Sequence, residues 1–165
     1  MKRALLIAAV ALLWTARTSR ADTTPPDYAP VDFNTLSDFP FDLPDIPFGQ
    51  KPDLRKLRPK IRSMIPQSIR SLDGKNVSVT GFMMPLDDDN NGGTRKFILM
   101  RNQITCCFGG ANRINEYVMV TMGSKSAPFV PNVPVKVEGT LAVGPQFEDG
   151  VLNGIYQMVG NEVRP

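Results

Sequence analysis

The sequence predicts a mostly β protein, a small five-stranded OB-like barrel preceded by short helical turns and a disordered arm. Five short segments between residues 76 and 163 alternate apolar and polar side chains with a period of two. Two of these segments contain an internal glycine, Gly81 and Gly139, which favours a curled sheet over a flat one. A proline-rich stretch precedes them and excludes long regular elements there. A small sandwich is the alternative architecture.

The N-terminus, residues 1–21, has the organisation of a cleavable signal peptide. Lys2 and Arg3 precede an apolar run over residues 4–14, too short to span a bilayer as a helix, and Ala21 ends a small-residue cleavage site. We expect a periplasmic or secreted protein whose mature chain has no integral membrane span; a retained anchor is the alternative. Cleavage removes four of the cations behind the formal net charge of +3 and leaves −1. The net charge of the mature chain therefore gives no reason to expect nucleic acid or anionic lipid as a partner, and it argues against nucleic acid.

Residues 22–50 are acidic and aromatic, and we expect them to form an extended, mostly disordered arm. Prolines recur too densely for a continuous helix or a central strand, and six Asp stand without any Lys or Arg. The apolar side chains among these acids are Phe33, Leu36, Phe39, Phe41, Leu43, Ile46 and Phe48. This mixture is typical of a segment that docks on another surface, and a solvated spacer is the alternative.

Residues 51–75 reverse the charge, with eight Lys or Arg against two Asp. The spacing of the leucines and isoleucines predicts helix, which Pro59 and Pro66 break into short turns, each proline at a first helical position. An acidic arm beside a basic segment suggests that the arm folds back on its own chain. Two separately solvated faces are the alternative.

Residues 76–165 form the expected β domain. Its strands are predicted at residues 76–86, 96–102, 116–122, 133–144 and 154–163. The fourth has the clearest alternation and places on one face Val133, Val135, Val137, Gly139 and Leu141. Between the first two strands, "DDDNNG" resembles the start of a calcium loop, but Ile98 stands where the bidentate acid belongs, so a hairpin turn is the better interpretation.

The chain has no histidine, and this closes several kinds of chemistry. Ser-His-Asp and Cys-His catalysis and histidine metal sites are excluded. No glycine-rich phosphate-binding motif is present, and the carboxylates show no spacing that suggests a catalytic pair. We therefore expect a protein that is not an enzyme.

The remaining candidate is "QITCCFGG", residues 103–110, which holds the only two cysteines, Cys106 and Cys107, followed by Phe108 and Gly109. In an oxidising compartment the pair has three interpretations. It forms a strained and easily reduced vicinal disulfide, it supplies thiolate ligands, or it is structural. As ligands, the thiolates suit Cu(I) together with methionine sulfur, or Zn(II) together with carboxylates. The candidate methionines are Met83, Met84, Met100, Met119, Met122 and Met158, for which core filling is the alternative role.

Four segments in order, "IPQSIRSLDGKNVSVTGFMMPL", "KFILMRNQITCCFGGANRINEYVMV", "VPVKVEGTLAVG" and "EDGVLNGIYQM", resemble an uncharacterised bacterial envelope family, the domain of unknown function 3299. A more distant similarity is to the C-terminal domain of a putative two-component permease system, carried by Phe97, Leu99 and Arg101 before the double cysteine. The resemblance implies an exported β-barrel-like domain associated with envelope transport of metals. It implies no catalytic mechanism.

These observations predict an exported, non-enzymatic binding or accessory module of an envelope complex linked to metal transport. Its contact or metal site is Cys106, Cys107, Phe108 and Gly109, with Cu(I) or Zn(II) as the candidate ion and an envelope protein such as an ABC-type transporter as the candidate partner. The alternative function is a periplasmic thiol-redox protein that uses a reducible vicinal disulfide.

Overall fold

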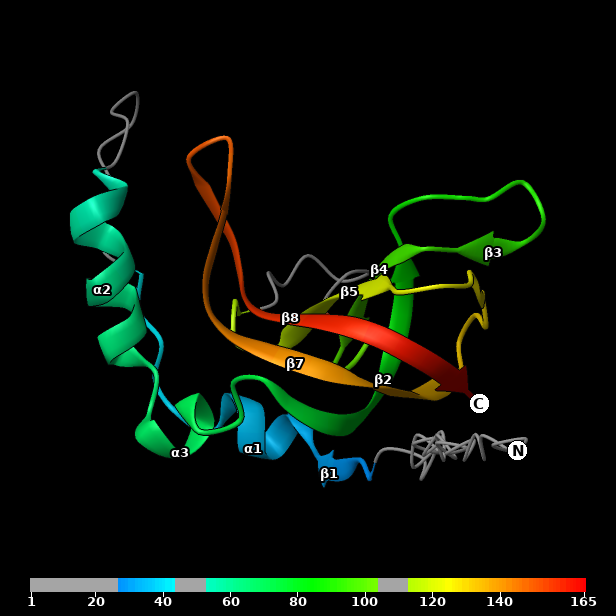
Figure 1. The fold of residues 1–165 in the computed structure, drawn as a ribbon, viewed down its shortest axis with the longest axis horizontal. Helices are drawn as coiled ribbons and strands as arrows, with labels where there is room; N and C mark the ends of the chain where they lie inside the picture. Colours follow the sequence, from blue (N-terminus) through cyan, green and yellow to red (C-terminus); the bar gives the residue numbers. More distant parts are fainter. Residues whose placement is uncertain (1–26, 44–52, 104–112) are drawn as a thin grey trace, which may run out of the picture.

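The computed structural model describes residues 27–43, 53–103 and 113–165, and these residues are mostly β (Figure 1). The elements in chain order are β1 (Ala29–Val31), α1 (Phe33–Ser37), α2 (Leu54–Met64), α3 (Gln67–Arg70), β2 (Lys75–Pro85), β3 (Gly93–Thr94), β4 (Lys96–Met100), β5 (Tyr117–Met122), β6 (Ala127–Pro128), β7 (Pro134–Glu148) and β8 (Val151–Arg164). None of the helices in this described part is long and apolar enough to cross a membrane.

The main sheet closes into a ring, because β7, the last strand in its order, pairs with β2 as well as with β8. Residues 75–82 of β2 pair with β7, and residues 82–85 pair with β4. The strand order is β1-β2-β4-β5-β8-β7 (Figure 1). The additional β2–β7 pairing closes the five strands from β2 to β7. Within the ring only the β5–β8 pair is parallel among the described pairings. β1 is added beside β2, also in parallel.

The five strands predicted from the alternating pattern are confirmed, and the alternation has the expected cause. Val77 and Val79 of β2 and Val135 and Val137 of β7 face the interior and are fully buried. The prediction is wrong for Val133, which precedes β7 and remains 45% exposed. The short strands β3 and β6, which pair with each other, were not predicted, because two residues are too few to show a period.

The two glycines that indicated curling lie where another part of the chain comes too close for a side chain. A Cβ on Gly139 would lie 2.3 Å from the carbonyl oxygen of Val159. A Cβ on Gly81 would lie 2.6 Å from the carbonyl oxygen of Met100 and 2.7 Å from the Phe33 ring. The β7–β8 register also shifts between Glu138 and Gly139, as at a β-bulge. Curling of the ring therefore depends on missing side chains at these positions.

Residues 27–43 depart from the expected disorder and pack on the ring. β1 pairs with β2, and α1 is capped by Asp32, whose carboxylate accepts the Thr35 N–H at 2.7 Å. The buried apolar side chains of this segment are Phe33, Leu36, Phe39 and Phe41. Each contributes about 1.5–3 kcal/mol on burial, which opposes the entropy of ordering the chain. The prolines still exclude long elements, but Pro30 is accommodated in a three-residue strand, and a five-residue helix fits between Pro30 and Pro40. Ile46 and Phe48 lie outside the described residues.

The segment docks through apolar contacts and not through the predicted charge pairing with the basic segment. The described ion pairs of α2 join Lys56 to Asp53 and Arg62 to Asp73, and neither acid belongs to residues 27–43. Burial of aromatic side chains in the core releases more free energy than exposed ion pairs, which are worth about 0–1 kcal/mol each. The acids of the segment stay on the surface as a consequence.

The expected break at Pro59 is wrong, because α2 continues through it. An interior proline costs a helix about 3 kcal/mol or more. Ile61 and Ile65 are nearly fully buried, and this packing on the core offsets the cost. Pro66 immediately precedes α3 and occupies its N-cap position.

The "DDDNNG" stretch forms the predicted turn between β2 and β4. Asn90 and Gly92 adopt positive φ angles of 62° and 75°. The Asp87 carboxylate accepts the Thr94 hydroxyl at 2.6 Å and the Lys96 N–H at 2.9 Å, and the Thr94 bond is the main reason for its lowered pKa. This carboxylate therefore holds its own loop together, as expected of a turn.

Truncation of Leu36 tests whether residues 27–43 belong to the cooperative fold. Leu36 is fully buried, so Leu36→Ala should lower the free energy of unfolding by about 2–5 kcal/mol through lost burial and a cavity. Leu43→Ala is the matched control in the same segment, since Leu43 is 51% exposed and its loss should cost less than about 0.5 kcal/mol. Urea unfolding measures both. Equal and small effects would contradict the docking of this segment.

Candidate functional site

The four predicted site residues, Cys106, Cys107, Phe108 and Gly109, lie outside the described residues. The structure describes the chain up to Gln103, after β4, and again from Arg113, before β5. β4 and β5 are antiparallel neighbours. Residues 104–112, here called the double-cysteine segment, therefore connect the ends of two neighbouring strands. The described residues at those two strand ends form the candidate site.

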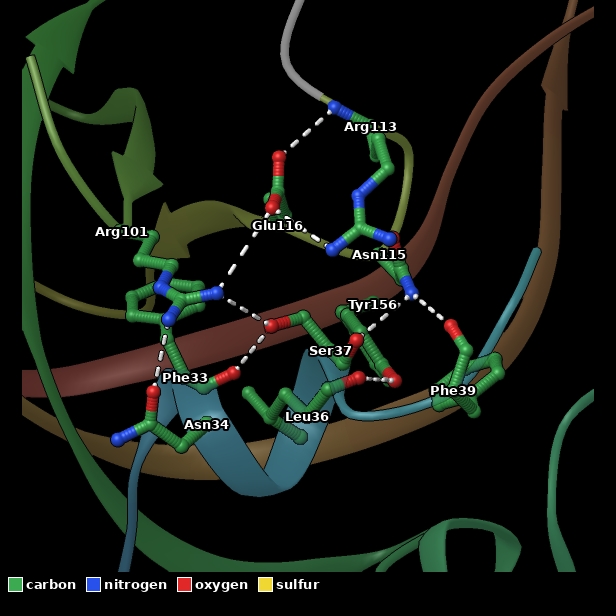
Figure 2. Close-up of polar contacts among 10 residues, drawn as sticks. All are labelled: Phe33, Asn34, Leu36, Ser37, Phe39, Arg101, Arg113, Asn115, Glu116 and Tyr156. Carbon is green, nitrogen blue, oxygen red and sulfur yellow. Dashed lines mark hydrogen bonds and ion pairs between the residues drawn. The ribbon is translucent and has the colours of Figure 1, made fainter. Parts of the chain in front are cut away.

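Glu116 lies at this place and contacts two arginines, one on each side of the segment in the sequence (Figure 2). Its carboxylate accepts the Arg113 side chain at 3.0 Å and the Arg113 backbone N–H at 3.1 Å. The same carboxylate lies 3.8 Å from the Arg101 guanidinium. The backbone continues the connection, because the Arg101 N–H donates to the Glu116 carbonyl at 3.2 Å. Glu116 thus links Arg101, which directly follows β4, to Arg113, the first described residue after the double-cysteine segment.

The charge state of Glu116 follows from these contacts. Partial burial by itself would raise its pKa, and its side chain is 16% exposed. The hydrogen bonds from Arg113 and the positive charges of Arg113 and Arg101 outweigh that effect, so the pKa lies below its usual value. Glu116 is therefore ionised at neutral pH and acts as an acceptor between two arginines.

Arg101 extends the network to the N-terminal segment. Its guanidinium donates to the Asn34 side chain at 2.9 Å and to the Ser37 hydroxyl at 3.2 Å (Figure 2). The Ser37 hydroxyl in turn donates to the Phe33 carbonyl at 2.6 Å. Arg101, which directly follows β4, therefore contacts both α1 and the Glu116 carboxylate.

Two buried side chains donate hydrogen bonds to backbone carbonyl groups at the end of α1 and just after it. The Tyr156 hydroxyl donates to the Leu36 carbonyl at 2.7 Å, and burial raises the Tyr156 pKa far above its ordinary value, so the phenol remains a donor. The Asn115 amide donates to the Phe39 carbonyl at 3.0 Å (Figure 2). The same amide also approaches the Ser37 carbonyl at 3.4 Å. The bonds to Leu36 and Ser37 satisfy acceptors that the helix end leaves without intrahelical partners. Asn115 neighbours Glu116, so α1 and the candidate site share one scaffold.

The methionines proposed as soft ligands are distributed over four strands. Met83, Met122 and Met158 are buried in the hydrophobic core, which supports the core-filling role. Met100 is also buried and ends β4, while Met84 and Met119 are half-buried. Among the described residues no three side chains of Cys, Asp or Glu cluster in a way that could hold a metal ion, and the two thiols stand outside that part.

A cleft of about 470 Å³ lies over β4, β5, β7 and β8, and sequence reasoning missed it. Its polar lining consists of Thr121, Thr140, Gln146, Asn153 and Gln157, with Lys96 and Glu148 as the charged residues. Apolar lining comes mainly from Met119, Phe147 and Val159. In the sequence these are the outward positions of alternating strands, which look the same whether they face bulk water or a cleft.

Substitution of Glu116 tests the network at neutral and acid pH. Glu116→Gln should lower the free energy of unfolding by about 1–2 kcal/mol, because charge-assisted bonds to Arg113 are lost. Since the folded pKa is depressed, the carboxylate contributes above the unfolded value of 4.5 and loses its contribution as pH falls through the folded pKa. The difference between wild type and variant should shrink below pH 4.5.

Urea unfolding over this pH range measures the effect. Glu148→Gln, at an exposed glutamate, is the control and should change the stability by less than about 0.5 kcal/mol. A Glu116→Gln deficit that stays the same from neutral to acid pH would contradict the role given to the carboxylate.

Comparison with known proteins gives a family and a fold. The family model described as "Protein of unknown function (DUF3299)" matches residues 55–165. The crystal structure of a DUF3299 family protein from Pseudomonas aeruginosa PAO1 is similar with a TM-score of 0.58 and 21% identity, covering 84% of this chain and 96% of that chain. No curated protein matches.

The shared fold is larger than the matched family segment. Residues 55–165 are 111 of the 165 residues, about two thirds, whereas the structural similarity covers 84% of the chain. Part of the sequence before residue 55 therefore belongs to the common fold, in agreement with the docking of residues 27–43. With the family model matching more than half of its length, the chain belongs to the DUF3299 family.

Proposed function

We propose that the protein is an exported, non-enzymatic binding module of an envelope complex, with the double-cysteine segment as its contact site. The observation that supports the proposal is the Glu116 network, which joins Arg101 after β4 to Arg113 before β5, on either side of that segment in the sequence. Loops that bind partners are commonly presented by a rigid scaffold in this way. Cys106, Cys107, Phe108 and Gly109 are the proposed contact residues.

An OB-like barrel is the architecture that we infer for the ring. The support is its five-strand order, β2-β4-β5-β8-β7, and the pairing of the last strand with the first. In OB-folds the second and third strands, together with loops after the first and fourth strands, bind ligands. The cleft over β4 and β5 lies beside the β7–β8 hairpin and near Leu86, which follows β2. Its position supports a binding function.

The described acids also favour binding over acid–base catalysis. Hydrogen bonds from Thr35 to Asp32, from Thr94 to Asp87 and from Ser126 to Asp89 are the main causes of the lowered pKa values of these carboxylates. Each carboxylate is ionised at neutral pH and holds a cap or a turn. A group used in this way is poorly suited to exchange protons with a substrate.

The proposed localisation, metal ion and partner class are based on the sequence. Residues 1–21 direct the chain to the periplasm or beyond, where the thiols meet Cu(I) or Zn(II) as candidate ions. An envelope transporter of the ABC type is the proposed partner class, on the resemblance to envelope metal transport. A thiol-redox protein with a reducible vicinal disulfide is the alternative, favoured by the adjacency of Cys106 and Cys107 in an oxidising compartment.

The state of the two sulfurs distinguishes these functions. For protein purified from the periplasm, we expect two free thiols that Cu(I) or Zn(II) protects from alkylation, and one bound metal ion by native mass spectrometry. The Cys106→Ser/Cys107→Ser variant should lose the metal completely while keeping its urea unfolding midpoint. A stable disulfide that exchanges with glutathione would support the redox alternative instead, and thiols that bind no metal would remove the metal from the proposal.

Crosslinking in intact envelopes tests the partner. The wild-type chain should crosslink to a membrane protein of the transporter class, and the Cys106→Ser/Cys107→Ser variant should lose most of that product. Leu43→Ala, an exposed change remote in sequence from the double-cysteine segment, is the control and should keep it. Equal crosslinking of all three chains would place the contact elsewhere and refute the role given to the segment.

A further inference from the structure

α2 concentrates positive charge to a degree that no other described element shares. Its eleven residues contain no acid and five cations: Arg55, Lys56, Arg58, Lys60 and Arg62. The chain from residue 22 onward carries a net charge of only −1, so this charge is a local property of the helix. Figure 1 shows α2 at the periphery, outside the ring of strands.

Two of the five cations have a structural role on the β7–β8 hairpin. Arg62 donates to the Val143 carbonyl at 3.0 Å and pairs with Asp73 at 3.3 Å. Arg58 donates to the Pro145 carbonyl at 3.2 Å and lies 4.9 Å from the centre of the Phe147 ring. These contacts satisfy acceptors on the part of β7 that extends beyond its pairing with β2.

The other three cations have no comparable role. Arg55, Lys56 and Lys60 are exposed. Within the described ranges the only ion pair among them joins Lys56 to Asp53 at 4.0 Å, with the lysine side chain 88% exposed. Lys56 and Lys60 lie one turn apart on one face of the helix, and Arg55 adds a third positive charge at the same end. We refer to these three exposed cations as the basic face.

This basic face is unfavourable for the helix itself. Arg55 and Lys56 stand in the first turn, where the helix dipole disfavours cations and where no acid is present. Lys56 and Lys60 repel each other as like charges four residues apart. Pro59 adds a further local cost within the same helix. Among the described residues, the only ion pair that compensates these three side chains is the exposed pair of Lys56 with Asp53. Residues with so little compensation indicate a function outside the fold.

We propose that Arg55, Lys56 and Lys60 dock the protein on the headgroups of an anionic phospholipid membrane. The charge of the face is complementary to phosphate, and a lipid surface accepts cations without fixed geometry. Half-buried Leu54 stands at the same end of the helix, where an apolar side chain suits the membrane interface. An acidic protein surface would need matched positions for each cation, and three flexible side chains supply none.

Vesicle flotation tests the proposal with the chain from residue 22 to residue 165. Residues 1–21 are omitted because their apolar run would insert into any bilayer, and every described contact lies between residues 27 and 165. We expect binding to vesicles of phosphatidylcholine mixed with phosphatidylglycerol, weakening with salt, and no binding to phosphatidylcholine alone. Arg55→Gln/Lys56→Gln/Lys60→Gln should weaken the binding at least about tenfold.

The control variant is Lys75→Gln/Lys125→Gln/Lys136→Gln, which removes the same charge from exposed lysines outside α2. Lys96 is left unchanged because it lines the cleft. The control should bind within about twofold of wild type if the basic face is responsible. Circular dichroism and the unfolding midpoint show whether each variant is folded. Equal loss in both variants, or no binding of wild type to the anionic vesicles, would overturn the proposal. Retention on immobilised polyglutamate without vesicle binding would identify an acidic protein as the partner and would overturn it as well.

Discussion

The sharing of β2 between β4 and β7 is the constraint on which the rest of the structure depends. The pairing of β2 with β7, the last strand in the order, closes the sheet. Closure makes β7 and β8 curl so closely that Gly139 has no room for a Cβ. A closed ring also has an interior that must be filled. Aliphatic side chains of the strands fill most of it, and Phe33 reaches the space that Gly81 leaves open. The N-terminal segment is therefore part of the core.

Packing of the N-terminal segment has a consequence for the candidate site. Once α1 lies against the ring, its carbonyl groups need donors, and Tyr156 and Asn115 supply them. Arg101 bonds to α1 and also approaches Glu116, which holds Arg113. The base of the double-cysteine segment is thus positioned by the same contacts that close the core. A loop on such a base can bind a partner without disturbing the fold, which is the physical basis of the proposed function.

Charge is used in two different ways in this molecule. The acids Asp87 and Glu116 accept several hydrogen bonds within the fold and stabilise turns and connections. On α2, Arg58 and Arg62 likewise hold the β7–β8 hairpin, whereas Arg55, Lys56 and Lys60 have little to hold. Partnered charges explain the fold. Among the described residues, the basic face has only the Lys56–Asp53 ion pair, and this is the reason to look for an anionic surface.

Features that depend on near neighbours along the chain could be predicted before any fold was known: the five strands, the turn at residues 87–92, and the two glycines that mark curling. A period of two and the tolerance of Asn and Gly for positive φ are local properties, so they can be read without a fold. Only the tertiary structure decided that Leu36 is buried, that α2 continues through Pro59, and that Glu116 lies between Arg101 and Arg113. For Leu36 and α2 the decisive free energy comes from residues far apart in sequence, brought together by ring closure. Glu116 contacts Arg113 three residues away, and the β4–β5 pairing brings Arg101 to it. The double cysteine was evident from the sequence as a candidate, while its anchors appeared only when β4 and β5 were paired.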